Sequence, residues 1–348
     1  MLLLTGCVQK QVVPTTPQEV NTSKPINVSQ PILDEAFVPQ ALKIAMILPS
    51  KKIGRYAHST STALFAYLLS RQHPFVFKTF QIKDESSHAM QTVVQKIEED
   101  GFDFVIAPLT KEGATNLAAL DNNLTFFLPT IHQNDMKQQH PNIYYGAINY
   151  QKQIDTLMTY AASPLVVMYD TSAQGQHLKE MSVRAYQKRV KGKIYTYGIN
   201  KKRSSVKNYL KDNHNVQHGS FVLNTPFIKS TMILSQLTLY DVEAENILST
   251  QINYDPLLFS MTQYRDRKHV YIANSIDLHN DKVSQSNALL SNDIIYDWIN
   301  YTSTVGADLF FYMMTGEERL YDLPIHEQQV YYPISIVQAK KARYEKVN

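Results

Sequence analysis

The segment 42–50, which reads Leu-Lys-Ile-Ala-Met-Ile-Leu-Pro-Ser, is the feature that most constrains the fold. A short apolar run that is bounded by turn signals is typical of a strand buried on both faces. A helical pattern of apolar residues follows over 57–70. Strand, polar loop and helix form the opening unit of an open parallel α/β sheet, which binds ligands at the carboxyl ends of its strands. We therefore expect a loop over 49–56, and a functional site there.

The rest of the body repeats this alternation in two rounds, which predicts an α/β fold of two doubly wound parallel-sheet lobes around a cleft. A chain of 348 residues is long enough for two domains. We expect a first lobe over 41–163, completed by a return segment from the C-terminal part. A second lobe with closing helices is expected over 164–338, followed by a tail over 339–348. Within the second lobe, one long helix is expected over about 288–314 and a closing strand over 330–338.

Composition narrows the classes of function. Hydrophobic residues make up 44% of the chain and charged residues 19%, which is ordinary for a soluble globular protein. The net charge of +3 is too small for a nucleic-acid-binding protein, whose basic footprint is stronger and clustered. We therefore expect no nucleic-acid partner.

The one cysteine, Cys7, closes the segment Leu4-Thr5-Gly6-Cys7, which resembles the bacterial lipobox. The resemblance implies lipidation of Cys7, a signal remnant over 1–7 and a location in the periplasm. Val8 stands where an aspartate would retain a lipoprotein at the inner membrane, so the resemblance points to the outer membrane. Because the apolar lead is shorter than the ~7 to 15 residues of a signal peptide, we expect the true start upstream. The alternative is a chance match.

Residues 8–40 are polar and rich in proline, without helical or alternating periodicity. Such a composition favours extended, poorly packed backbone. With Cys7 lipidated, this segment is expected to be a flexible tether that holds the body away from a membrane. Without it, the segment is a disordered end with no role.

The order of motifs over about 42–335 resembles the type I periplasmic-binding-protein family, and within it the branched-chain amino-acid receptors and the LpoA-type activators of penicillin-binding proteins. In the receptors, the segment that resembles 104–110 places small hydroxyl residues against an amino acid. Two departures stand out: Lys51 and Lys52 lie beside the expected pocket, and Leu109 to Glu112 is bulkier than the serine-rich receptor version. The other resembling segments are 42–50, 128–130, 165–170 with Gly175, and 248–250.

The sequence contains no enzyme signature: no Gly-x-Ser-x-Gly, Walker loop, His-Glu-x-x-His or glycine-rich dinucleotide fingerprint. We expect a protein that is not an enzyme and has no cofactor. Three possible metal ligands lie close together in the sequence: Asp212, His214 and His218. The segment around them is polar and loop-like, so it would not hold the three side chains in a fixed geometry. We read it as a solvated loop and expect no metal.

Short polar side chains at the predicted strand ends are the candidate ligand-binding residues. Such side chains can donate and accept hydrogen bonds to a small ligand. Turn and helix-cap roles explain the same residues equally well, and a histidine there is also typical of a surface loop. The candidates are Ser50, Thr110, Thr130, His132, Thr171 and Asn224.

A basic stretch without acidic residues lies between Glu180 and Asp212. It would suit an anionic glycan, lipid headgroups or an acidic protein surface. The alternative is an ordinary solvated face offset by acidic residues elsewhere. The cations are Arg184, Lys188, Arg189, Lys191, Lys193, Lys201, Lys202, Arg203, Lys207 and Lys211.

Together these features predict a lipid-anchored periplasmic protein that acts by binding. The leading hypothesis is a partner-binding regulator or scaffold of the peptidoglycan machinery of the cell envelope. The alternative is a solute receptor for an amino acid or similar small molecule that feeds an ABC transporter, with lobes that close on the ligand.

Overall fold

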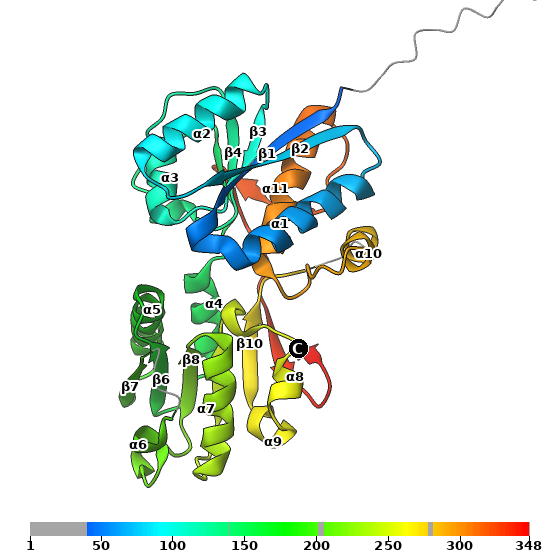
Figure 1. Cartoon of the computed structure of the whole chain (residues 1–348). Coiled ribbons are helices and arrows are strands. Elements are labelled where there is room, and N and C mark those ends of the chain that lie inside the picture. Colours follow the sequence, from blue (N-terminus) through cyan, green and yellow to red (C-terminus); the bar gives the residue numbers. More distant parts are fainter. Residues whose placement is uncertain (1–39, 139, 201–204, 278–280, 348) are drawn as a thin grey trace, which may run out of the picture. The chain divides into compact units, whose positions relative to one another are not determined.

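The computed structural model describes residues 40–138, 140–200, 205–277 and 281–347, without the side chains of 50–56 (Figure 1). Cys7 and the predicted tether lie outside these ranges, apart from Gln40. Two sheets of seven strands each carry the fold, and most of their strand pairs are parallel. The predicted α/β class is confirmed.

The first sheet has the strand order β11-β12-β5-β4-β3-β1-β2. Strand β1, next to the edge strand β2, pairs in parallel with β2 on one side and with β3 on the other. The strands are β1 Leu42–Pro49, β2 Phe75–Ile82, β3 Phe104–Ile106, β4 Thr125–Leu128, β5 Ile143–Tyr145, β11 Ile325–His326 and β12 Gln329–Val330. The helices of this lobe are α1 Ser50–Ser70, α2 Ser87–Glu99, α3 Lys111–Ala118, η1 Gln133–Asp135, α10 Asp281–Leu289 and α11 Trp298–Thr315.

The second sheet has the strand order β14-β13-β10-β9-β8-β6-β7, so β7 lies at its edge. Its strands are β6 Leu165–Asp170, β7 Ile194–Ile199, β8 Ser220–Asn224, β9 Asn246–Ser249, β10 Val270–Asn274, β13 Ser335–Ala339 and β14 Tyr344–Lys346. Its helices are α4 Tyr150–Leu157, η2 Met158–Tyr160, α5 Ala173–Arg189, α6 Lys207–Leu210, η3 His214–Val216, α7 Phe227–Leu239, η4 Gln251–Asn253, α8 Leu258–Met261 and α9 Tyr264–Arg267.

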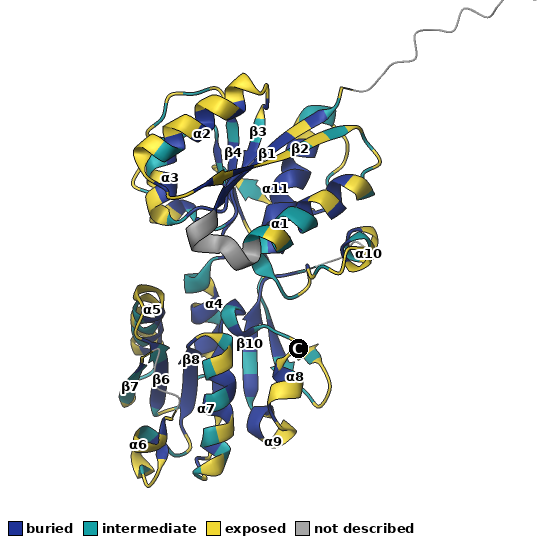
Figure 2. Cartoon of the chain, viewed as in Figure 1, coloured by how far each residue is buried: buried dark blue, intermediate teal, exposed yellow. Residues whose placement is uncertain are grey.

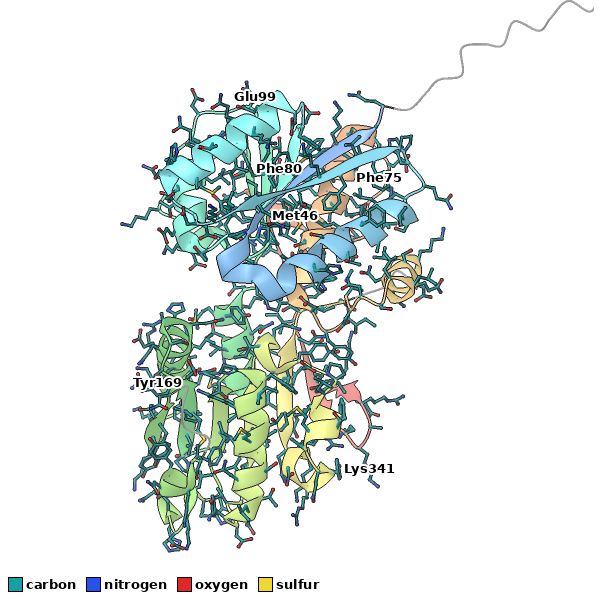
Figure 3. The ribbon with its side chains drawn as sticks, in the orientation of Figure 1. Met46, Phe75, Phe80, Glu99, Tyr169 and Lys341 are labelled. Atoms are coloured by element: carbon teal, nitrogen blue, oxygen red, sulfur yellow. The ribbon has the colours of Figure 1, made fainter. Side chains whose placement is uncertain are left out.

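Helices cover both faces of each sheet. This is expected because β1 and β6 are nearly continuous runs of apolar residues, which must be buried on both sides. Phe75 and Phe80 of β2 show the two layers of the first lobe: Phe75 packs with α1 and α11, and Phe80 packs with α2 (Figure 3). In the second lobe, α4 and α5 cover one face, and α6, α7 and α8 cover the other. Figure 2 shows the buried residues along the strands and the inner helix faces.

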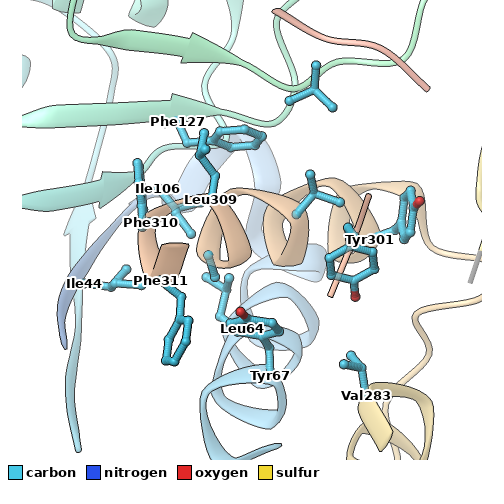
Figure 4. Packing of buried hydrophobic residues seen from close by; sticks show 14 of the residues in the cluster. Ile44, Leu64, Tyr67, Ile106, Phe127, Val283, Tyr301, Leu309, Phe310 and Phe311 are labelled. Atoms are coloured by element: carbon cyan, nitrogen blue, oxygen red, sulfur yellow. The ribbon is translucent and has the colours of Figure 1, made fainter. Parts of the chain in front are cut away.

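Helix α11 is the core helix of the first lobe. Residues 300–311 are all buried, and Figure 4 shows Tyr301, Leu309 and Phe310 in the core cluster. Phe310 also stacks on Phe104, with ring centroids 4.7 Å apart. Its start is fixed by Asp297, whose side chain accepts from the amides of Ile299 and Asn300. Its end is fixed by Gly316 at φ 72°, a left-handed cap that glycine adopts without strain. None of the helices formed by described residues is long and apolar enough to span a membrane.

Three element predictions are wrong. The expected loop over 49–56 is not formed, because α1 begins at Ser50, directly after β1. The helix expected over 288–314 is two helices, α10 and α11, separated where Asp293 accepts from the amides of Ile295 and Tyr296. The strand expected over 330–338 divides into β12 of the first sheet and β13 of the second, on either side of Pro333, which cannot donate to a ladder.

Candidate functional site

The candidate site is the set of polar groups at the carboxyl ends of the parallel strands, where open α/β sheets bind ligands. In the first lobe, Thr110 follows β3 and Thr130 follows β4. The two strands are neighbours, and the Thr130 hydroxyl donates to the Leu109 carbonyl at 2.5 Å. The two predicted residues are therefore brought together, and the hydroxyl of Thr130 is engaged within the protein.

Thr110 is held by a buried carboxylate that the sequence did not indicate. The amide of Thr110 donates to Glu85 Oε1 at 3.0 Å, and its hydroxyl donates to Glu85 Oε2. Glu85 is only 2% exposed, and its side chain lies against the position where Gly113 of α3 lacks a Cβ. The carboxylate thus caps the start of α3, which lacks a side-chain cap from its own N-cap residue.

His132 makes two contacts through its ring nitrogens. Nδ1 accepts from the amide of Asn134 at 3.2 Å, and Nε2 lies 3.3 Å from the amide nitrogen of Asn149. The side-chain oxygen of Asn149 accepts from the amide of Lys152 at the start of α4. Because Nδ1 accepts the hydrogen bond from the amide of Asn134, a doubly protonated ring would lose it. Burial lowers the pKa of His132 below its ordinary value, although the nearby Asp135 carboxylate acts to raise it.

A cavity of about 180 Å³ opens beside His132. Its polar lining includes the Asp135 carboxylate, the His177 ring from α5 and Tyr150 at the start of α4. The Tyr150 hydroxyl is buried without a hydrogen-bond partner among the described residues, and burial raises its pKa. This cavity gathers a carboxylate and two imidazoles, whereas the Tyr150 hydroxyl is itself fully buried. Its volume is below the ~300 to 1,000 Å³ of typical ligand pockets.

In the second lobe, the carboxyl end of the sheet carries an ion pair. Asp170, the last residue of β6, accepts from Lys229 Nζ at 2.8 Å, and the two side chains are 8% and 17% exposed. Burial by itself raises the pKa of Asp170, but hydrogen bonds from Lys229 and from Ser172 outweigh burial, and the net pKa is lowered. Lys229 also donates to the Asn200 carbonyl at 2.8 Å. The pair therefore fixes the start of α5 and the end of β7.

The other predicted residues of this lobe differ in exposure. Asn224, at the end of β8, is 1% exposed and donates to the Ser182 hydroxyl of α5 at 3.0 Å. Its side-chain oxygen is buried without a partner in the described part of the chain. Thr171 is exposed next to Asp170. Ser50 is the first residue of α1, and its side chain lies outside the described residues. The ligand role of all six candidates stays a prediction.

A buried amide network joins the ends of three elements of the second lobe. Gln153 of α4 donates to the Ser275 hydroxyl at 2.8 Å and accepts from the amide of Gln251 at 3.0 Å. The Gln251 side chain accepts in turn from the amide of Ser275 at 2.6 Å. All three residues are at most 2% exposed, so the network is structural. Sequence periodicity does not predict this network, because its members are far apart in the chain.

A second cavity, of about 410 Å³, touches all three connections between the two sheets. Lys152 contributes from the first connection, Asp277 from the second and Tyr331 from the third. Tyr321 and Tyr332 also line it, and their buried hydroxyls have no hydrogen-bond partner among the described residues. Within the described part of the chain, no group of three or more His, Cys, Asp or Glu side chains is placed to hold a metal ion.

Comparisons with known proteins support the fold. No protein-family model matches the sequence, and no curated protein does. Among solved structures, a putative branched-chain amino acid ABC transporter protein from Rhodospirillum rubrum has a TM-score of 0.67 at 10% identity; the match covers 88% of this chain and 100% of that one. A branched-chain amino acid ABC transporter periplasmic ligand-binding protein from Burkholderia xenovorans has a TM-score of 0.67 at 13% identity, covering 89% and 95%.

LpoA from Haemophilus influenzae is also similar, with a TM-score of 0.55 at 11% identity. That match covers 90% of this chain and 60% of LpoA. The chain therefore has the fold of the type I periplasmic binding proteins, as the sequence resemblance implied. At these identities the likeness establishes the fold alone.

Proposed function

We propose that this protein is a non-catalytic, lipid-anchored periplasmic protein that binds a protein partner and regulates or scaffolds the peptidoglycan machinery of the cell envelope. The observation that carries the proposal is the internal use of the polar groups at the strand ends. Thr110 bonds Glu85, Thr130 bonds Leu109, and Asn224 bonds Ser182. The hydroxyls of Thr110 and Thr130 and the side-chain nitrogen of Asn224, which a receptor would offer to an amino acid, are here occupied by the fold.

An open strand edge supports binding of a protein. β2 is the last strand in the order of the first sheet, and among the described strands it pairs only with β1, along all eight of its residues. Beside it are three exposed apolar side chains: Phe65 and Leu69 of α1, at 40% and 48%, and Val76 of β2, at 44%. A free edge with an apolar margin is a surface onto which another chain can add a strand.

Site-specific photocrosslinking in living cells tests the proposal. A photoreactive residue at Leu69 is expected to capture an enzyme of peptidoglycan synthesis, identified by mass spectrometry. The matched control is the same residue at Leu239 of α7, which is 67% exposed and lies in the other lobe. Capture at Leu69 of the membrane subunits of a transporter would contradict the proposal, and so would equal capture at both positions.

The second candidate is a solute receptor that serves an ABC transporter, and the cavity beside His132 favours it. Asp135 offers a charge to an ammonium group, and His132 and His177 offer imidazole rings. A thermal shift with one amino acid, abolished by Asp135→Asn and retained in Asp155→Asn on the exposed face of α4, would establish this function in place of the first.

A further inference from the structure

The acid-free stretch between Glu180 and Asp212 is a surface of unpaired cations in the folded protein. Every one of its seven described Lys and Arg residues is exposed. None of the seven side chains forms an ion pair or hydrogen bond within the described part of the chain. We call this surface the basic rim; it comprises Arg184, Lys188, Arg189, Lys191, Lys193, Lys207 and Lys211.

The basic rim follows one margin of the second lobe. Its residues come from the last turns of α5, from the connection to β7, and from α6 with the residue after it. β7 is the edge strand, and α5 and α6 cover opposite faces of its sheet. Figure 1 shows α5, β7 and α6 at this same margin of the sheet. The cations therefore flank the edge from both sides.

This arrangement contrasts with that of three cations elsewhere, each of which has a carboxylate partner. Lys78 pairs with Asp100 at 2.7 Å, Lys229 pairs with Asp170, and Arg71 pairs with Glu317. On the basic rim, the nearest acidic residues in sequence are Glu180 and Asp212, at its two ends. Because none of the seven cations is paired with a carboxylate of the described residues, their charges are free to attract an anionic surface.

The side chains of the basic rim suit a surface whose negative charge is spread over many groups. Five of its seven cations are lysines, which are mobile point charges rather than the rigid forks that bind a single carboxylate in two places. Tyr195 and Tyr197 of β7 are half-buried beside them, and Tyr197 stacks on Tyr209 of α6 at 4.7 Å. Tyrosine between lysines is typical of proteins that rest at a membrane–water interface.

We propose that the basic rim binds the surface of an anionic lipid bilayer. Each cation near such a surface contributes about 1 kcal/mol, or about a fivefold change in affinity. Seven cations are more than the four that a lipid-binding basic cluster needs. The proposal does not depend on the function proposed above, nor on lipidation of Cys7.

The test is co-sedimentation of the full chain with vesicles, using Cys7→Ser protein so that no lipid anchor contributes. The vesicles are of equal parts phosphatidylglycerol and phosphatidylcholine, or of phosphatidylcholine alone. We expect binding to the first only, weakening steeply as salt rises. A rim variant with Arg184, Lys188, Lys191 and Lys193 changed to Gln is expected to lose about two to three orders of magnitude in affinity.

A matched control removes the same net charge elsewhere: Lys83, Lys96, Lys111 and Lys137 of the first lobe, all exposed, are changed to Gln. This control is expected to bind within a few-fold of the parent. A second rim variant, Lys207→Gln with Lys211→Gln, is expected to weaken binding about 25-fold. It tests the proposal independently if the first variant does not fold.

Three results would overturn the proposal: equal binding to both kinds of vesicle, equal loss in the control and rim variants, or tighter binding to soluble polyglutamate. The last result would assign the basic rim to an acidic protein segment instead.

Discussion

Glu85 and Asp170 are the two carboxylates on which the strand ends of the two lobes depend. Both are buried, and both accept hydrogen bonds at the start of a helix: Glu85 from Thr110 before α3, and Asp170 from Ser172 before α5. A buried carboxylate is stable only when donors replace the lost water, and each of these has such donors. These residues therefore hold the candidate site in shape, whatever it binds.

Replacing Glu85 by Ala is expected to lower the free energy of unfolding by about 1 to 3 kcal/mol. The substitution leaves the amide of Thr110 without an acceptor and opens space beside Gly113. Urea denaturation of the purified chain measures the change. Glu112→Ala, an exposed change in the first turn of α3, serves as the control and should cost less than about 0.5 kcal/mol. An equal loss of unfolding free energy in the two variants would contradict the role of Glu85 as the cap of α3.

Asp170 predicts a pH dependence of stability. Its pKa is lowered in the folded protein, so its contribution is present above its unfolded-state pKa of about 4 and is lost as pH falls through the lower folded-state pKa. Asp170→Asn should therefore be less stable than the parent by about 2 kcal/mol at pH 7, and the difference should shrink as the pH falls below 4.

Chemical denaturation at several pH values measures this difference, and Asp155→Asn on the exposed face of α4 is the control. A difference for Asp170→Asn that stays constant down to pH 2 would contradict the assignment of a lowered pKa.

Helix α11 packs against β4 so closely that one of its positions must be glycine. A Cβ on Gly306 would lie 2.4 Å from Cδ1 of Phe127, a fully buried ring of β4. Gly306→Ala is expected to destabilise the chain by about 1 to 3 kcal/mol through overpacking. Thermal or urea unfolding measures this loss.

Phe127→Leu provides the matched test of the cause, because it shortens the ring that the new methyl group would strike. It should relieve part of the loss in the double variant with Gly306→Ala. It should not relieve Gly316→Ala, where no atom lies within 4 Å and the loss comes from φ 72° alone. Strict additivity of Phe127→Leu and Gly306→Ala would rule out the steric explanation.

Sequence periodicity predicted helices well where it was strong. The spacing of Met90, Val93, Val94 and Ile97 predicts an amphipathic helix over 87–99, and α2 occupies this range with these four residues buried. The break between α10 and α11 was missed because apolar residues continue through 288–314, while the break depends on Asp293 and Asp297 accepting local amides. Such side-chain bonds do not alter the hydrophobic pattern, which is why the pattern alone could not locate the break.

For the whole molecule, the order of strands and helices was sufficient to predict the fold, and the comparisons with solved structures confirm it. The candidate site was predicted only as a place, the carboxyl ends of the strands. Its chemistry was not predictable, because Thr110 meets Glu85 from a loop 25 residues earlier and Asp170 meets Lys229 from 59 residues later. Whether a hydroxyl faces a ligand or a neighbouring carboxylate depends on packing between segments, which one sequence does not encode locally.

Native mass spectrometry tests the central claim most directly. The chain would be purified without denaturation, incubated with a mixture of the common amino acids, and weighed before and after mild unfolding. We expect the mass of the polypeptide and its lipid alone, because the polar groups at the strand ends are engaged within the fold. One small molecule released per chain would contradict the claim and identify a solute receptor.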